Sequence, residues 1–175
     1  GHQALLRELT KIFPKVITWA SDNPDKKHQI PLLKRTELLR ILVKKISNPN
    51  LELVQDLSRP RTINTLKKAL QLWPEASFSF VIGSDLTVQI PNWLNAKSVL
   101  KKAKIAIAIR EGWPISNKHL EEINKLGGTI ELLPFKIPES SSSTFRTRPQ
   151  EGLVPSELIP TLLEENLYGF ADKRK

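Results

Sequence analysis

Residues Phe78-Ser79-Phe80-Val81-Ile82 form a short apolar run that stops at Gly83-Ser84-Asp85, and Ile105-Ala106-Ile107-Ala108-Ile109 form a second run. Runs of this length are typical of strands buried on both faces, and such strands occur in parallel sheets that helices cover. A helical pattern around residues 99–104 separates the two runs. These stretches therefore predict an α/β protein built on parallel strands.

Helical and extended patterns alternate on both sides of these runs. Before them, the sequence predicts helices at 5–13, 33–46 and 62–73 and strands at 16–19 and 51–54. After them, it predicts a helix at 120–126 that ends at Gly127-Gly128, a strand at 129–133 and a last helix at 156–165. This order favours a doubly wound parallel sheet with helices on both faces.

The length of 175 residues fits one domain, so we expect a single domain over residues 1–175. Its opening helix has no strand before it, although the first strand–helix turn of a doubly wound sheet usually carries the phosphate site. We therefore expect a strand and a phosphate loop ahead of Gly1. Within the domain, we expect a Ser-rich loop at 139–150 and a C-terminal helical segment at 153–170.

Composition excludes several classes of protein. With 39% hydrophobic and 26% charged residues the chain can bury a core, and no apolar run is long enough to span a bilayer. The absence of Cys excludes disulfides, thiolate nucleophiles and Cys-bound zinc, and three scattered His residues argue against a His-rich metal site. No secretory signal is present in the sequence, so we expect a soluble, cytoplasmic protein without a membrane partner.

The charge balance indicates an anionic partner. Lys and Arg number 27 against 18 acidic residues, which gives a formal charge of +9 and a pI near 9.9. Such a field attracts nucleic acid, nucleotides, phosphorylated metabolites or an acidic membrane surface. Aromatic residues are only 6% of the chain and the basic residues are spread along it, so a nucleic-acid partner is not expected.

Two segments in the N-terminal half of the chain could bind phosphate. Gly1-His2 would lie at a helix N-terminus, which attracts anions, but a tag remnant or a frayed end is the plainer interpretation. The polar segment 21–28 follows a strand, where open α/β sheets bind ligands, so Lys26, Lys27 or His28 could hold a phosphorylated substrate. A solvated turn is the alternative, and Arg35 is either a further anion contact or simply exposed.

Three further positions could contact a nucleotide. Gly83 would let a ligand approach the backbone, and the Asp85 carboxylate could accept from a ribose hydroxyl or help to hold a hydrated metal. Asp85 could equally be a helix N-cap. Trp93 could stack on a flat heteroaromatic ring, although a core position is the default for such a residue.

The segment Ser140-Ser141-Ser142-Ser143-Thr144-Phe145-Arg146 allows two interpretations. Its composition is that of a low-complexity linker. The same hydroxyl groups, closed by the planar guanidinium of Arg146, would also form a cradle for a phosphate.

Six sequence blocks together resemble the bacterial nicotinate-nucleotide adenylyltransferases, of cyanobacterial type, in the nucleotidylyltransferase superfamily. Gly1-His2 resembles the end of the His-x-Gly-His motif, and residues 140–146 resemble the Ile-Ser-Ser-Thr-x-x-Arg signature. Residues 80–85 and 90–93 resemble the Gly-x-Asp and Pro-x-Trp blocks, residues 59–66 the Pro-Ser-Tyr-Thr-x-x-Thr-Leu block, and residues 153–155 with 167–168 the C-terminal helix and closing Leu-Tyr. The blocks keep the family's order across essentially the whole chain.

The resemblance implies a Rossmann-like fold and a reaction. The family joins nicotinate mononucleotide to the AMP part of ATP and forms deamido-NAD and pyrophosphate, with Mg²⁺ as cofactor. The substrate phosphate attacks the α-phosphorus in line, without a covalent enzyme intermediate. ATP and nicotinate mononucleotide are therefore the expected partners, and a homo-oligomer is left open.

The resemblance also implies roles for individual residues. ATP phosphates would contact Gly1, His2, Ser141, Ser142 and Arg146, while adenosine and its ribose would contact Gly83, Asp85 and Arg110. Nicotinate mononucleotide would contact Asn23, Lys26, His28, Thr62 and Trp93, with the ring of Trp93 stacked on the pyridine. No protein ligand to a metal is expected with these motifs.

The chain departs from the family pattern at several positions. Arg61 and Leu94 stand where Tyr is common, Glu111 stands where Pro is usual, and Ser143 occupies a Thr position. The first strand and the first His of the phosphate motif are absent before Gly1, and a polypeptide that truly began there should be nearly inactive. The alternatives are an adenylyltransferase that uses the amide mononucleotide or phosphopantetheine, and an inactive nucleotide-binding paralogue.

Overall fold

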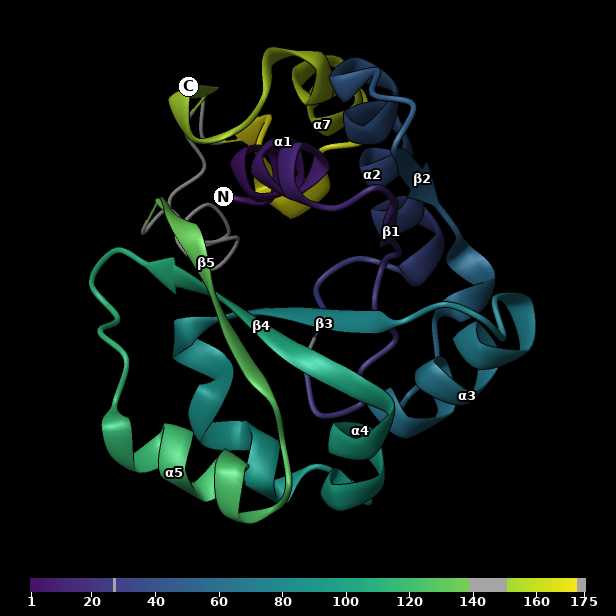
Figure 1. The fold of residues 1–175 in the computed structure, drawn as a ribbon. Coiled ribbons are helices and arrows are strands. Elements are labelled where there is room, and N and C mark those ends of the chain that lie inside the picture. Colours follow the sequence, from purple (N-terminus) through teal and green to yellow (C-terminus); the bar gives the residue numbers. More distant parts are fainter. Residues whose placement is uncertain (27, 139–150, 173–175) are drawn as a thin grey trace. The chain divides into compact units, whose positions relative to one another are not determined.

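A computed structural model describes residues 1–26, 28–138 and 151–172 (Figure 1). The chain divides into two compact units: unit 1 holds residues 1–58 and the C-terminal segment, and unit 2 holds residues 59–139. Each unit contains a parallel sheet, β1-β2 in unit 1 and β3-β4-β5 in unit 2. The α/β class with parallel strands is therefore confirmed.

Unit 1 opens with the elements that the sequence predicts. They are α1 (His2–Ile12), β1 (Val16–Thr18), α2 (Leu32–Ile46) and β2 (Leu51–Leu53). The 3₁₀ helix η1 (Gln55–Leu57) follows β2 and was not predicted. β1 and β2 pair in parallel, with Val16 opposite Leu51. The amphipathic helix at the N-terminus buries Leu6 and Leu9, as its spacing predicts.

The C-terminal segment of unit 1 consists of short helices. They are η3 (Glu151–Leu153), η4 (Ser156–Leu158), α7 (Ile159–Glu164) and η5 (Leu167–Gly169). Leu162, Leu167 and Phe170 form a buried cluster with Ile30, which lies just before α2. Since residues from both ends of the chain share this cluster, the C-terminal segment contributes to the core of unit 1.

Unit 2 alternates helices and strands. Its elements are α3 (Thr62–Leu72), β3 (Phe78–Gly83), the 3₁₀ helix η2 (Ser84–Asn92), α4 (Ala96–Lys102), β4 (Ala103–Arg110), α5 (Asn117–Lys125) and β5 (Ile130–Ile137). All three strands run parallel, with β4 in the centre. β4 starts two residues earlier than predicted, because Ala103 and Lys104 already pair with β3.

The central strand is the most buried element of unit 2. Residues Ile105, Ala106, Ile107 and Ala108 are all 0% exposed, which confirms the prediction of a strand buried on both faces. Ile105 and Ile107 form a cluster with Ile90 of η2, Leu100 of α4 and Ile123 of α5. These contacts place η2, α4 and α5 against the same face of the sheet, as Figure 1 shows.

β5 extends further than the sequence predicts. The predicted strand stops at Leu133, whereas β5 continues through Pro134 to Ile137. Its register against β4 shifts between Ile107 and Ile109, so the proline lies in an irregularity of the pairing. Proline has no amide hydrogen, and a bulge on an edge strand is where a strand tolerates it.

Candidate active site

The N-terminus of α1 carries the first two predicted phosphate contacts. Gly1 is the residue before the helix, its carbonyl accepts from the Leu5 amide (3.1 Å), and His2 is the first helical residue. Both residues are exposed. His2 thus lies on the first turn of an eleven-residue helix, where a helix N-terminus attracts anions, and a phosphate contact there stays a prediction.

The loop between β1 and α2 carries Asn23, Lys26 and His28. Lys26 and His28 are exposed. Asn23 has a local role: its Oδ1 accepts from the Asp25 amide (2.8 Å), and its carbonyl accepts from the Lys26 amide (3.2 Å). Asn23 thus forms an Asx turn that shapes the loop.

Arg35 fixes both ends of this loop. Its guanidinium donates to the carbonyls of Ser21 (2.5 Å) and Ile30 (3.4 Å). Burial lowers the pKa of Arg35, but a guanidinium pKa is so high that the group stays charged at neutral pH. The sequence suggested an anion contact or an exposed side chain, whereas the structure shows a clamp on the backbone.

Gln55 anchors the start of the same loop, and sequence analysis missed it. The Ala20 amide donates to Gln55 Oε1, and Gln55 Nε2 donates back to the Ala20 carbonyl, both at 2.9 Å. The Asp22 amide also donates to Ser58 Oγ (3.1 Å). Side chains that follow β2 therefore hold the backbone that follows β1, and no local sequence signal marks this pairing.

Gly83, Asp85 and Arg110 meet at the carboxyl ends of β3 and β4. Arg110 Nη1 lies 3.2 Å from Asp85 Oδ2, and the two side chains are 21% and 19% exposed. Asp85 Oδ1 and Arg110 Nε are buried and have no hydrogen-bond partner among the described residues. One donor and one acceptor thus lie side by side with unused hydrogen-bonding capacity.

Gly83 makes room for this pair. A Cβ atom at position 83 would collide with Asp85 Oδ1 and would lie 3.7 Å from Arg110 Nε. The sequence interpretation was that a small residue lets a ligand approach; in the structure it also lets the Asp85 carboxylate fold back over the strand end. Asp85 is the second residue of η2, whose N-cap is Gly83, so the alternative of an Asp85 N-cap is wrong.

Ser84 connects the two strand ends and was not singled out from the sequence. Its Oγ donates to the Trp113 carbonyl (2.6 Å) and accepts from the Arg110 amide (2.9 Å). The side chain is buried, and its carbonyl accepts from the Thr87 hydroxyl (2.8 Å). Ser84 therefore ties the backbone beside Asp85 to the backbone of Arg110.

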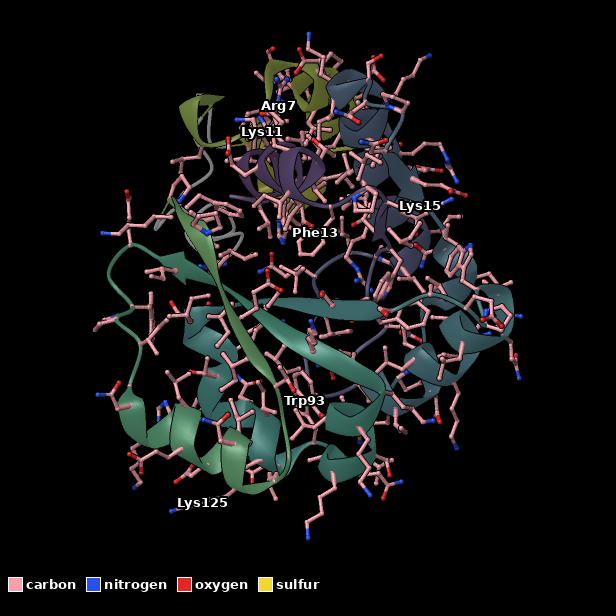
Figure 2. All side chains as sticks on the ribbon, in the orientation of Figure 1. Arg7, Lys11, Phe13, Lys15, Trp93 and Lys125 are labelled. Carbon is pink, nitrogen blue, oxygen red and sulfur yellow. The ribbon has the colours of Figure 1, made fainter. Side chains whose placement is uncertain are left out.

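Thr62 and Trp93 lie in the helical layer of unit 2. Thr62 is the first residue of α3, and its neighbour Ile63 is buried in the cluster against which Trp93 packs. Trp93 meets Phe80 edge to face, with ring centroids 5.7 Å apart and an interplanar angle of 79°. Figure 2 shows Trp93 on the side of the sheet that α4 covers. The structure shows its packing role, and stacking on a pyridine ring stays a prediction.

Ser141, Ser142 and Arg146 lie outside the described residues. Among the residues that the structure does describe, no group of three or more His, Asp or Glu side chains could hold a metal ion. The same residues include no helix long and apolar enough to cross a membrane.

A cavity of about 250 Å³ lies elsewhere in unit 1, between α1 and the end of α2. It is lined by Arg7, Glu8, Thr10, Lys11, Ile46 and Asn48. Figure 2 labels Arg7 and Lys11. Lys11 is paired with Glu8 (2.6 Å), and no residue assigned to a nucleotide lines the cavity.

Taken unit by unit, the predicted residues fall into two groups. Unit 1 carries the exposed residues Gly1, His2, Lys26 and His28, together with the half-buried Asn23. Unit 2 brings Gly83, Asp85 and Arg110 into direct contact, and it packs Trp93 beside the start of α3.

Known proteins resemble the chain over nearly its whole length. Residues 1–148 match the family model described as cytidylyltransferase-like. A Synechocystis sp. protein named "Probable nicotinate-nucleotide adenylyltransferase" is 30% identical, with 96% of this chain and 92% of that protein covered. A protein of the same name from Carboxydothermus hydrogenoformans is 29% identical, with 96% and 90% covered.

Solved structures show the same fold. Plasmodium falciparum nicotinic acid mononucleotide adenylyltransferase complexed with NaAD has a TM-score of 0.79 to this chain at 19% identity, with 97% of this chain and 90% of that chain covered. A complex of the same protein with APC has a TM-score of 0.75. Because the family model matches residues 1–148 and a named relative is 30% identical over nearly the whole chain, the chain belongs to the cytidylyltransferase-like family and, within it, to the nicotinate-nucleotide adenylyltransferases.

Proposed function

We propose that this nucleotidyltransferase transfers the adenylyl group of ATP to nicotinate mononucleotide, giving deamido-NAD and pyrophosphate. The observation that carries the proposal is the Gly83–Asp85–Arg110 group. It lies where β3 and β4 end, which is where open parallel sheets bind nucleotides. Its unpartnered carboxylate oxygen and guanidinium Nε match the donor and acceptor character of ribose hydroxyls.

The reaction needs positioned charges but no nucleophile from the protein, because the attacking group belongs to the substrate. The phosphate of nicotinate mononucleotide attacks the α-phosphorus of ATP, the bond to the bridging oxygen breaks, and pyrophosphate leaves with the electron pair. Such a transfer is accelerated by alignment and by cations around the phosphates. We assign the phosphates of ATP to Gly1, His2, Ser141, Ser142 and Arg146, and adenosine to Gly83, Asp85 and Arg110.

The acceptor nucleotide is assigned to two segments. Asn23, Lys26 and His28 belong to the loop after β1, where the side chains of Lys26 and His28 are exposed. Thr62, at the start of α3, offers its hydroxyl and the helix N-terminus to the nicotinate carboxylate. Trp93 is assigned to the nicotinate ring.

Magnesium fits this site as a partner of the ATP phosphates. Mg²⁺ is usually held by one or two carboxylates together with substrate phosphates, and it keeps several waters. Near the strand ends, the carboxylate of Asp85 would be a ligand of this kind. When bound, Mg²⁺ neutralises phosphate charge.

The test is product formation by the full-length protein. We expect deamido-NAD and pyrophosphate from ATP and nicotinate mononucleotide. The kcat/KM for the amide mononucleotide should be lower by on the order of a hundredfold or more. The reason is that donors that face a carboxylate mispair with an amide NH₂. Arg146→Ala should lose about 2–4 kcal/mol of transition-state stabilisation, the usual scale for one such donor.

Arg40→Ala is the matched control, because Arg40 is an exposed arginine on α2. It should retain the parental kcat/KM. Equal kcat/KM for the acid and amide substrates would favour the amide-using relatives. Binding of both nucleotides without product would identify an inactive paralogue, and tight binding of duplex DNA at high salt without nucleotide binding would reverse the proposal.

A further inference from the structure

The turn after β4, at residues 110–113, is fixed by several hydrogen bonds, although residues 111–113 are exposed. The Trp113 amide donates to the Arg110 carbonyl (3.0 Å), and Gly112 has a φ of 79°. These are the features of a type II turn, in which the third residue needs a positive φ and is therefore usually Gly. The Glu111 amide also donates to the Ile137 carbonyl (3.0 Å), which ties the turn to β5.

The buried Ser84 hydroxyl fixes the turn at both ends. It accepts from the amide of Arg110, the first residue of the turn, and donates to the carbonyl of Trp113, the last. Ser84 is only 4% exposed, so each bond is buried at its Ser84 end. These two bonds therefore tie the backbone of Trp113 to that of Asp85, which follows Ser84 directly.

The side chain on this fixed backbone is exposed. Trp113 is 53% exposed, whereas Trp93 in the same unit is half-buried against the core. Indole carries one of the largest apolar surfaces of any side chain, and burying it contributes strongly to stability or binding. A rigid, exposed indole that does not serve the core is suited to cover the face of a flat ligand.

The position of the turn identifies the ligand. It follows the carboxyl end of β4, beside the Asp85–Arg110 pair that the proposed function assigns to adenosine. Resting on that function, we propose that Trp113 is the stacking surface for the adenine ring of ATP and that Ser84 is the positioning residue that holds it there. Stacking of a base on an aromatic side chain needs only two flat faces.

The experiment compares Trp113→Ala and Trp113→Phe with the parent in the full-length protein. Trp113→Ala should raise the KM for ATP about tenfold or more, the usual effect of removing a base-stacking ring, while the KM for nicotinate mononucleotide stays within about twofold. Trp113→Phe should restore most of the ATP affinity. Leu72→Ala, which removes another exposed apolar side chain from unit 2, should change neither KM.

Inorganic tripolyphosphate separates the base from the phosphates. It competes with ATP but has no adenine ring, so its Ki should be the same for the parent and Trp113→Ala. A Ki that rises in step with the KM for ATP would show that the turn acts on the phosphate site and would overturn the inference. An unchanged KM for ATP in Trp113→Ala would overturn it too. So would a variant in which only the oligomeric mass changes and the KM for ATP does not.

Ser84 has a matched partner for its own test. Thr87 is also buried, and its hydroxyl bonds to the Ser84 carbonyl without touching the turn. Ser84→Ala and Thr87→Val should both lower the melting temperature, but only Ser84→Ala should raise the KM for ATP. Equal KM values for the two variants would refute the positioning role. A parent protein that forms no deamido-NAD would instead refute the proposed function.

Discussion

Gln55 and Ala20 exchange two hydrogen bonds of 2.9 Å, one in each direction, although 35 positions separate them in the sequence. The amide side chain of Gln55 thereby imitates the neighbouring strand that the backbone of Ala20 would otherwise need. Ala20 is buried, so its amide and carbonyl depend on this side chain.

Gln55→Leu should therefore destabilise the protein. Two buried backbone groups lose their partners, and each unsatisfied group costs about 1–3 kcal/mol. Gln55→Glu should fall between the parent and Gln55→Leu, because a carboxylate still accepts from the Ala20 amide but cannot donate to its carbonyl. Urea denaturation of the three proteins measures the order, and equal midpoints would show that the pair contributes nothing.

Gly83→Ala should weaken ATP binding and stability together. The new methyl group would collide with Asp85 Oδ1 and would force the carboxylate away from Arg110. Overpacking of this kind costs about 1–3 kcal/mol. Gly152→Ala is the control, since no atom lies within 4 Å of a Cβ atom at that position. If the two variants have the same KM for ATP and the same denaturation midpoint, the collision has no consequence.

The binding role of Trp93 is best tested with a conservative variant. Its ring packs against Phe80 and against two buried clusters, so Trp93→Ala should destabilise the fold. Because the ring is only half-buried, the cost should be below the about 3–5 kcal/mol of a fully buried large-to-small substitution. Trp93→Phe keeps an aromatic ring and should remain folded. Its KM for nicotinate mononucleotide should rise, and its KM for ATP should not. An unchanged KM for both substrates would leave Trp93 with a packing role alone.

The ion pair between α2 and η4 predicts a loss of stability in acid. Lys45 Nζ lies 2.6 Å from Glu157 Oε1, and this hydrogen bond lowers the pKa of Glu157 below its ordinary value. A lowered carboxyl pKa adds stability above the unfolded-state pKa, and this stability disappears as the pH falls through the folded-state pKa.

Glu157→Gln should accordingly be less stable than the parent near neutral pH and equal to it in acid. Urea midpoints measured across the carboxyl titration range test this. Glu52→Gln, which breaks the exposed Lys15–Glu52 pair, is a control for the general loss of one acidic residue. A difference between the parent and Glu157→Gln that persists at the acidic end would contradict the assignment.

Local patterns were sufficient for most elements of the fold. Within the run Ile105–Ile109, residues 105–108 became the fully buried centre of β4, because successive apolar residues leave no polar face. Gly127-Gly128 ended α5 as predicted: Gly127 has a φ of 84°, and the Gly128 amide donates to the Ile123 carbonyl (3.0 Å). In both cases the signal lies within a few residues of its effect.

The elements that sequence analysis missed depend on distant partners. Ser84 reaches a turn 26 to 29 positions away, and Arg35 reaches back across the loop that it closes. η2 contains Pro91 and carries no clear helical period, so its residues gave no prediction of a 3₁₀ helix. The Gly-x-Asp motif pointed to Asp85, and the folded chain shows that Gly83 and Arg110 lie against its carboxylate.

Pro134 has a consequence for how molecules of this protein meet one another. Among the described residues β5 pairs only with β4, so its far side offers backbone groups to which a second chain could add a strand. Pro134 has no amide hydrogen to offer to a neighbouring strand, and the exposed Lys136 places a charge on the same edge strand. Natural sheets protect their borders from fibril-like association in this way. The same residue that disturbs the register of β5 therefore also makes this edge of the sheet a poorer template for an added strand.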